Sequence, residues 1–125
     1  MQRTDRAAFG ISDFYEAVGG DLDEVIDRLE DLDMVKENLL DFSEDTAYAE
    51  LTENLRKNDS KDAFRAAHTL KGICYTFGIG RLGDSAAAIC EELRRGAFPT
   101  GEMTERLTKE YDLVIRAIGR LRDGR

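Results

Sequence analysis

The sequence predicts an all-α protein: an antiparallel up-and-down four-helix bundle with additional short N-terminal helices. Aliphatic residues recur at spacings of three and four, no segment shows sustained alternation, and proline occurs once. Short connections favour antiparallel packing of neighbouring helices. At 125 residues the chain is long enough for a core without disulfides or metals. We therefore expect one domain over residues 1–125, with its core at about 11–122.

Three short amphipathic segments come first. The helix predicted over residues 11–18 ends at Gly19 and Gly20, because glycine tolerates the left-handed conformation that closes a helix. Asp21 can cap the next helix, and a break at residues 31–33 separates it from a third. The apolar positions of the second and third segments are Leu22, Val25, Ile26, Leu29, Leu32, Val35, Leu39 and Phe42.

The central region predicts two helices. One follows a capping region at residues 43–45 and fades at residues 58–60. The next starts at Asp59 or Ser60 and runs to about Phe77, where Gly-Ile-Gly at residues 78–80 stops it. This second helix carries the only histidine of the chain.

Two further helices complete the bundle. A tight turn predicts an antiparallel partner over residues 81–95, closed by Gly96. Residues 98–101 form the only linker with proline, and Thr100 can cap a last long helix. The apolar stripes of these two helices are Leu82, Ala86, Ile89, Leu93, Met103, Leu107, Tyr111, Val114, Ile118 and Leu121.

Charge and composition exclude several function classes. A net charge of -8 argues against a nucleic-acid partner, because phosphate binding favours a basic face. No segment approaches the roughly 18 apolar residues of a membrane span and no signal peptide is evident, so we expect a cytoplasmic protein without a membrane partner. With one histidine and two distant cysteines, Cys74 and Cys90, no metal site is expected. We interpret both cysteines as small buried residues.

The single histidine, His68, is predicted to face away from the core. At about 100° per residue, the apolar positions of its helix fall on the opposite side. These positions are Ala63, Ala66, Ala67, Leu70, Ile73, Cys74 and Phe77. An exposed imidazole in its uncharged form can act as a nucleophile. His68 is therefore the candidate for chemistry.

The exposed side around His68 is locally basic and aromatic. The residues within about 60° of His68 are Lys61, Phe64, Arg65, Lys71, Gly72 and Tyr75. Three cations beside a nucleophilic imidazole suit an oxygen-rich dianion such as a phosphoryl group. Gly72 costs roughly 1 kcal/mol in a helix interior, so its presence one turn beyond His68 indicates that something approaches closely there. Two exposed aromatic residues, Phe64 and Tyr75, indicate a docking patch.

The run from His68 to Gly72 reads His-Thr-Leu-Lys-Gly, and Thr-Phe-Gly follows at residues 76–78. This pattern resembles the histidine-containing phosphotransfer (Hpt) domains of bacterial phosphorelays, and the resemblance covers nearly the whole chain. It implies a four-helix bundle in which His68 accepts a phosphoryl group from an aspartyl phosphate on a receiver domain and passes it to another receiver. Lys71 would neutralise the phosphoryl oxygens, and Gly72 would clear the approach.

The resemblance also implies the partners. These are response-regulator receiver domains or a hybrid histidine kinase, docked on Lys61, Phe64, Arg65 and Tyr75. We expect no cofactor on this chain and place Mg²⁺ on the partner receiver. The sequence lacks a GxxxxGK[ST] loop, so we expect a phosphocarrier without autonomous kinase activity rather than an enzyme. We expect a monomer.

Two positions differ from the family pattern, and alternatives remain open. Ile73 and Tyr75 stand where small residues are usual. A bulky ring at Tyr75 would narrow the set of receivers that fit, or mark a degenerate Hpt-like module that binds receiver domains without being phosphorylated. A hydrolase using Cys74 and His68 is disfavoured, because the two residues point about 120° apart on one helix. A structural adaptor would depend on the core and not on the basic face.

Overall fold

The computed structural model describes residues 8–29 and 31–124; residues 1–7, 30 and 125 of the predicted domain lie outside this description. All regular elements within the described residues are α-helices, which confirms the predicted class. They are α2 (Ile11–Val18), α3 (Leu22–Leu29), α4 (Leu32–Phe42), α5 (Ala47–Arg56), α6 (Ser60–Thr76), α7 (Gly80–Arg94) and α8 (Gly101–Asp123). In this part of the chain, no helix has the length and apolar character needed to cross a membrane.

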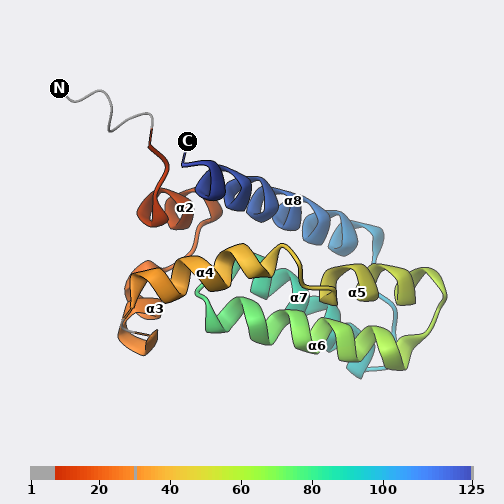
Figure 1. The fold of residues 1–125 in the computed structure, drawn as a ribbon. Coiled ribbons are helices and arrows are strands. Elements are labelled where there is room, and N and C mark those ends of the chain that lie inside the picture. Colours follow the sequence, from red (N-terminus) through yellow and green to blue (C-terminus); the bar gives the residue numbers. More distant parts are fainter. Residues whose placement is uncertain (1–7, 30, 125) are drawn as a thin grey trace.

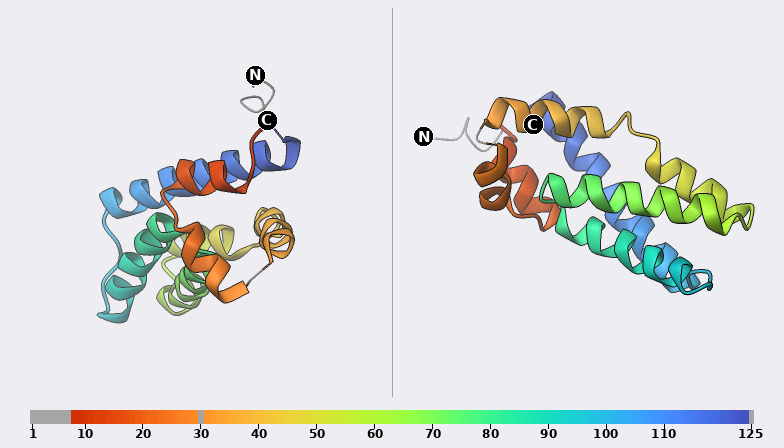
Figure 2. Two further views of the ribbon diagram at one scale, coloured as in Figure 1. Left: turned by 90° about the vertical axis from the view of Figure 1, so that its left-hand side faces the viewer. Right: turned by 90° about the horizontal axis from the view of Figure 1, so that it is seen from below.

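The long helices run up and down in antiparallel order (Figure 1). α6 packs against both α5 and α7, and α7 also packs against α8. α4 and α5 follow one another along one side of the bundle, so two shorter helices share that side (Figures 1 and 2). α2 packs against α8, and α3 packs against α4. The predicted four-helix bundle with short N-terminal helices is confirmed.

Side chains fix where several helices begin. Asp31, Asp59 and Thr100 each accept a hydrogen bond from a backbone N–H in the first turn of α4, α6 and α8, respectively. Asp59 is thus the cap of α6, one of the two residues predicted for that place. α5 begins just after the predicted capping region, because Asp45 accepts a hydrogen bond of 2.7 Å from the N–H of Ala47.

The core lies between the helices and leaves one side of α6 outside it. The residues predicted to face away from His68 are buried or half-buried, which confirms the orientation of the helix. Cys74 and Cys90 are both free and buried, as predicted. The largest fully buried side chains are Phe14, Leu39, Leu51, Leu70, Ile79, Leu82, Ile89, Leu107, Ile118 and Leu121. The side chain of Leu29 lies outside the described part.

Candidate functional site

His68 lies on the exposed side of α6, at the edge where α6 meets α7. Together with residues of both helices it lines a shallow surface hollow; these residues are Phe64, Arg65, Thr69 and Arg94. The centre of the imidazole ring is 6.1 Å from the centre of the Phe64 ring, and the two planes are tilted by 33°. The structure thus leaves the imidazole open to a partner.

Gly72 lies one turn beyond His68 and leaves an open approach. A Cβ atom added at this position would meet no atom within 4 Å. The space over Gly72 is therefore not required by the packing of this chain. A group of a partner that approaches His68 can occupy this space.

The predicted cations differ in how free they are. Arg65 is exposed, and its guanidinium lies 3.6 Å from Asp62 in an ion pair within α6. Lys61 is exposed and Lys71 is half-buried, and neither forms a hydrogen bond or ion pair with other described residues. The basic face is therefore partly offset by Asp62, which the angular count had placed off this face. Lys71 keeps its charge free for an anion, whereas the charge of Lys61 also attracts the Asp59 carboxylate at the start of α6.

Phe64 corrects one prediction. It is half-buried and packs against the core rather than lying exposed. The guanidinium carbon of Arg94 sits 5.8 Å from the centre of its ring. The angular count along α6 missed this because it ignores the neighbouring helix, which covers part of the same side. Phe64 lines the hollow with the part of its ring that stays exposed, and its role in docking stays a prediction.

Tyr75 is exposed, as predicted, but its ring leans on α7. Its hydroxyl donates a hydrogen bond of 2.6 Å to the carboxylate of Asp84. A Cβ atom at Gly83 would lie 2.6 Å from the ring, so Gly83 provides the space that the ring fills. Partial burial and then the bond to Asp84 raise the pKa of Tyr75 to about 12, so the phenol is neutral near pH 7. His68 stays exposed beside it.

Arg94 is the site residue that reasoning from α6 alone missed. It comes from the last turn of α7 and forms an ion pair of 3.8 Å with Glu91. A signal was available, because Phe64 and Arg94 are equally far in sequence from Ile79 in the turn between the two helices. In an antiparallel pair, residues equidistant from the turn lie opposite one another. Arg94 is therefore the second cation, after Arg65, that lines the hollow beside His68.

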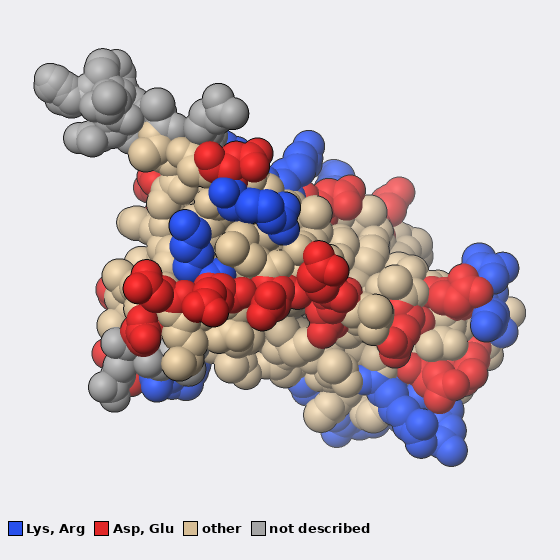
Figure 3. Space-filling model, viewed as in Figure 1, with Lys and Arg blue, Asp and Glu red and all other residues tan. Residues whose placement is uncertain are grey.

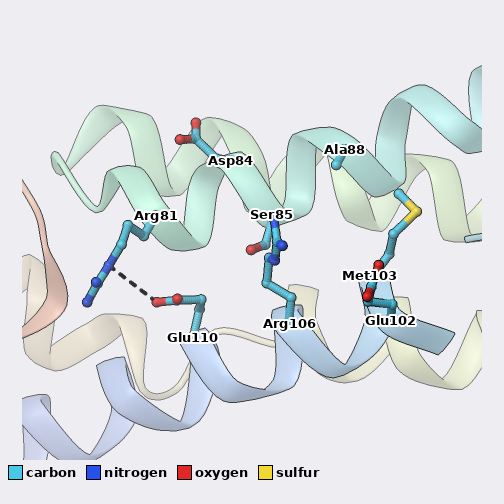
Figure 4. A pocket seen from close by; sticks show the side chains of 8 residues that line it. All are labelled: Arg81, Asp84, Ser85, Ala88, Glu102, Met103, Arg106 and Glu110. Atoms are coloured by element: carbon cyan, nitrogen blue, oxygen red, sulfur yellow. Dashed lines mark ion pairs between the residues drawn. The ribbon is translucent and has the colours of Figure 1, made fainter. Parts of the chain in front are cut away.

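A second hollow, of about 360 Å³, lies between α7 and α8 (Figure 4). Its walls carry Arg81, Asp84, Ser85, Ala88, Glu102, Met103, Arg106 and Glu110. Arg81 and Glu110 form an ion pair of 3.6 Å across it. Charges of both signs line this hollow and none of its residues comes from α6, but Asp84 on its wall also accepts the hydrogen bond of Tyr75.

The charge of the surface changes between α4 and α6. Asp33, Glu37 and Asp41 recur every four residues on the exposed side of α4. Figure 3 shows acidic side chains in a row across this part of the molecule, with basic side chains above the row and along the lower edge. The acidic row of α4 thus lies on a different helix from His68 and the basic residues around it.

Cys74 takes no part in this site. It is buried on the core side of α6, and burial, with Asp45 as a second cause, raises the pKa of its thiol to about 12. The thiol is protonated near pH 7, and His68 points to the other side of the helix. A nucleophilic pair of Cys74 and His68 is excluded by this geometry. In the described residues no three His, Cys, Asp or Glu side chains are grouped so as to hold a metal ion.

The comparison with known families decides the assignment. A family model described as the Hpt domain matches residues 21–117. The chain belongs to the Hpt domain family. Searches of the curated proteins and of the solved structures gave no match. Hpt domains are phosphocarrier modules of two-component signalling that interact with receiver domains or kinases, and the helical bundle described above is the architecture of this family.

The matched region contains every site residue named above. It begins at Asp21, which caps α3, and ends within α8. α2 lies before it and packs against α8. His68, within the matched region, is the only histidine of the sequence.

Proposed function

We propose that His68 accepts a phosphoryl group from an aspartyl phosphate on a receiver domain and passes it to another receiver. The observation that carries the proposal is the open surface at His68: an exposed imidazole one turn from Gly72, where an added Cβ would meet no described atom within 4 Å apart from its own turn of the helix. A receiver can bring its phosphoaspartate up to this surface without any movement of the bundle.

The transfer forms one bond and breaks another. A lone pair of the neutral imidazole forms a P–N bond, while the P–O bond to the receiver aspartate breaks and its electrons leave with the carboxylate. The ring then carries the positive charge until a ring proton leaves. Transfer to the next receiver reverses these steps with a second aspartate as the nucleophile.

Three residues of this chain support that chemistry by position. Lys71 follows His68 by three residues, on the same side of α6, and its ammonium has no other partner among the described residues. It can neutralise a phosphoryl oxygen as charge builds up. Gly72 keeps the approach open, and Arg94 adds a cation from α7. We place Mg²⁺ on the receiver domain and propose no cofactor on this chain.

The docking surface extends around His68. Lys61 and Arg65 lie before it on α6, and Tyr75 lies beyond it. We propose that receiver domains, or the receiver of a hybrid histidine kinase, contact these residues, and that the protein acts as a monomer without autonomous kinase activity. The charged residues would set the orientation and rate of encounter.

Phosphorylation of His68 is tested by intact mass. The protein is incubated with receiver domains charged by a small phosphodonor and Mg²⁺, beside a His68→Gln variant. We expect a gain of about 80 Da in the wild type, the mass of one phosphoryl group, that is lost in acid and absent in the variant. A gain that persists in His68→Gln contradicts the assignment.

Binding measurements with the same receivers distinguish this proposal from the alternative, a degenerate module that binds receivers without being phosphorylated. A degenerate module would bind receivers with equal affinity in the wild type and His68→Gln, and neither form would gain mass. Size-exclusion chromatography with light scattering reports the oligomeric state in the same samples.

A further inference from the structure

The exposed side of α6 continues past Gly72 to Tyr75, and this stretch is built together with α7. Tyr75 follows His68 by seven residues, which places it within about 20° of His68 around the helix and about 10 Å farther along its axis. Gly72, between them, carries no side chain. A partner centred on His68 therefore meets the Tyr75 ring without an intervening obstacle.

Any receiver that docks on His68 covers Tyr75. A specific protein interface of standard size buries about 800 Å² per partner, equivalent to a disc of roughly 16 Å radius. Tyr75, at about 10 Å, falls well inside such a disc. We therefore expect Tyr75 to contact the receiver because of its position on α6.

Two residues of α7 hold the Tyr75 ring in one place. The ring fills the space over Gly83, where a Cβ would come within 2.6 Å of it, and the hydroxyl donates to Asp84 at 2.6 Å. Tyr75 and Gly83 are equally far in sequence from Ile79, as are Phe64 and Arg94. Both pairs therefore belong to one seam between α6 and α7, on either side of His68. A side chain fixed in this way loses little conformational entropy when a partner binds.

The two ends of this seam differ in charge. Near Phe64 stand Arg65 and Arg94, whereas near Tyr75 stands the carboxylate of Asp84. Figure 4 shows Asp84 directed away from α8. Arg28 is also close, but its guanidinium donates to the carbonyls of Tyr75 and Thr76 and forms an ion pair with Glu24. The Asp84 oxygen that does not accept from Tyr75 has no other partner among the described residues.

We propose that Tyr75, held by Gly83 and Asp84, is a specificity-determining residue that selects receiver domains. The partner it fits places its acidic phosphorylation site over His68, and an apolar side chain with an adjacent basic group over Tyr75 and Asp84. Receivers without that pair of groups leave the Asp84 carboxylate covered and unpaired, which disfavours them. This inference rests on the proposed function, because the receiver must dock on His68.

A panel of receiver domains tests the proposal. Each is charged by a small phosphodonor, and kcat/KM for transfer to His68 is measured for the wild type, Tyr75→Ala, Tyr75→Phe and Asp84→Asn. We expect Tyr75→Ala to reduce about tenfold the ratio of kcat/KM between the best and the worst receiver. Tyr75→Phe keeps the ring but removes its hydrogen bond to Asp84, and Asp84→Asn keeps an acceptor oxygen but removes the negative charge. We expect each of these two variants to reduce this ratio less.

Phe98→Ala is the matched control. Phe98 is 43% exposed, against 40% for Tyr75, but lies in the connection between α7 and α8. We expect the receiver ratio to be unchanged in this variant. If Tyr75→Ala changes kcat/KM by the same factor for every receiver, the ratio between the best and worst receivers stays unchanged, and the proposal is overturned.

Dissociation constants for the uncharged receivers separate this inference from the proposed function. If the wild type is never phosphorylated but receivers bind it, the proposed function fails, and the ratio of dissociation constants in Tyr75→Ala still decides the role of Tyr75. If no receiver binds the wild type, both fail. Circular dichroism of each variant shows whether the bundle has remained folded.

Discussion

The two halves of α6 have opposite surroundings. Around His68 and Gly72 the helix is open: the imidazole has one aromatic neighbour, and nothing occupies the space over the glycine. At its C-terminal end the helix is held by side chains of two other helices. The Tyr15 hydroxyl of α2 donates to the carbonyl of Phe77 at 2.6 Å, and Arg28 of α3 donates to two further carbonyls at 2.7 and 2.8 Å.

The turn after α6 is held as closely. Gly78 has a positive φ of 69°, and its carbonyl accepts a hydrogen bond of 3.0 Å from the N–H of Asp21. The short N-terminal helices thus bind the carbonyl end of α6, which no further turn of the helix satisfies. The comparison teaches that the reactive surface can stay free of contacts because the helix is fixed elsewhere.

The largest expected effect is on the fixed end. Gly78→Ala places a Cβ 2.4 Å from the Val25 side chain and 2.7 Å from the Asp21 carbonyl oxygen, at a positive φ. We expect a loss of about 2–5 kcal/mol in the free energy of unfolding, from backbone strain and overpacking together. Urea unfolding measures it.

Gly96→Ala isolates the backbone part of that loss. Gly96 also has a positive φ, of 86°, but a Cβ there meets nothing within 4 Å. We expect this variant to lose only about 1 kcal/mol. Equal losses in the two variants would show that the contact with α3 does not matter.

The next effect is on the open surface of α6 around Gly72. There we expect a substitution to add stability, whereas Gly78→Ala reduces it. Gly72→Ala replaces a glycine in a helix interior where space is free, so we expect about 0.5–1 kcal/mol of added stability. Phosphotransfer to His68 should nevertheless slow by about tenfold or more, equal to roughly 1.4 kcal/mol in the barrier, because the new methyl group occupies the approach. Thermal unfolding and transfer kinetics measure the two effects.

Gly119→Ala is the control for Gly72→Ala. Gly119 lies in the interior of α8, again with nothing within 4 Å of an added Cβ. We expect similar added stability and unchanged transfer. Unchanged transfer in Gly72→Ala as well would remove Gly72 from the site.

A smaller effect is expected for the arginine that binds the end of α6. Arg28→Ala removes the side-chain donor to the carbonyls of Tyr75 and Thr76, although the Tyr75 carbonyl still accepts from the N–H of Gly78 at 3.3 Å, and we expect a loss of about 1–2 kcal/mol in stability. Transfer per folded molecule should not change. In Arg56→Ala the lost guanidinium paired, among the described residues, with Glu53 on the same exposed helix surface, so we expect a smaller loss of stability than in Arg28→Ala. Hydrogen exchange of the last turn of α6 reports the difference directly.

The smallest effect is expected for the cation contributed by α7. Arg94→Ala should slow transfer by about twofold to fivefold, since an exposed charge or cation–π contact contributes about 0.5–1 kcal/mol. Arg95→Ala is matched in residue type, exposure and an i,i+3 ion pair, but Arg95 does not line the hollow. We expect the transfer rate to be unchanged in Arg95→Ala. Equal slowing in both variants would indicate only a general charge effect.

Local signals in the sequence were sufficient for the elements of this bundle. Asp59 and the glycines at residues 78–80 placed both ends of α6 to within a residue, because caps and stop signals act on the nearest backbone groups. The apolar spacing also gave the side of α6 that is buried, and with it the exposure of His68. Each of these depends only on residues a few positions apart.

Contacts between helices could not be obtained that way. Phe64 was predicted to be exposed and is half-buried, because α7 covers it. The angular count also placed Tyr75 on the exposed side but could not show that Gly83 and Asp84 fix its ring. Arg94 is near His68 only because α7 turns back along α6.

By itself the sequence determined the helices, the orientation of α6 and the motif that runs from His68 to Gly72, since these follow from periodicity and neighbouring residues. The tertiary structure decided which cations surround the imidazole, which aromatic ring remains exposed and what holds the end of α6. The physical reason is that side chains distant in the chain set these properties, and their positions depend on how helices pack rather than on how each one forms.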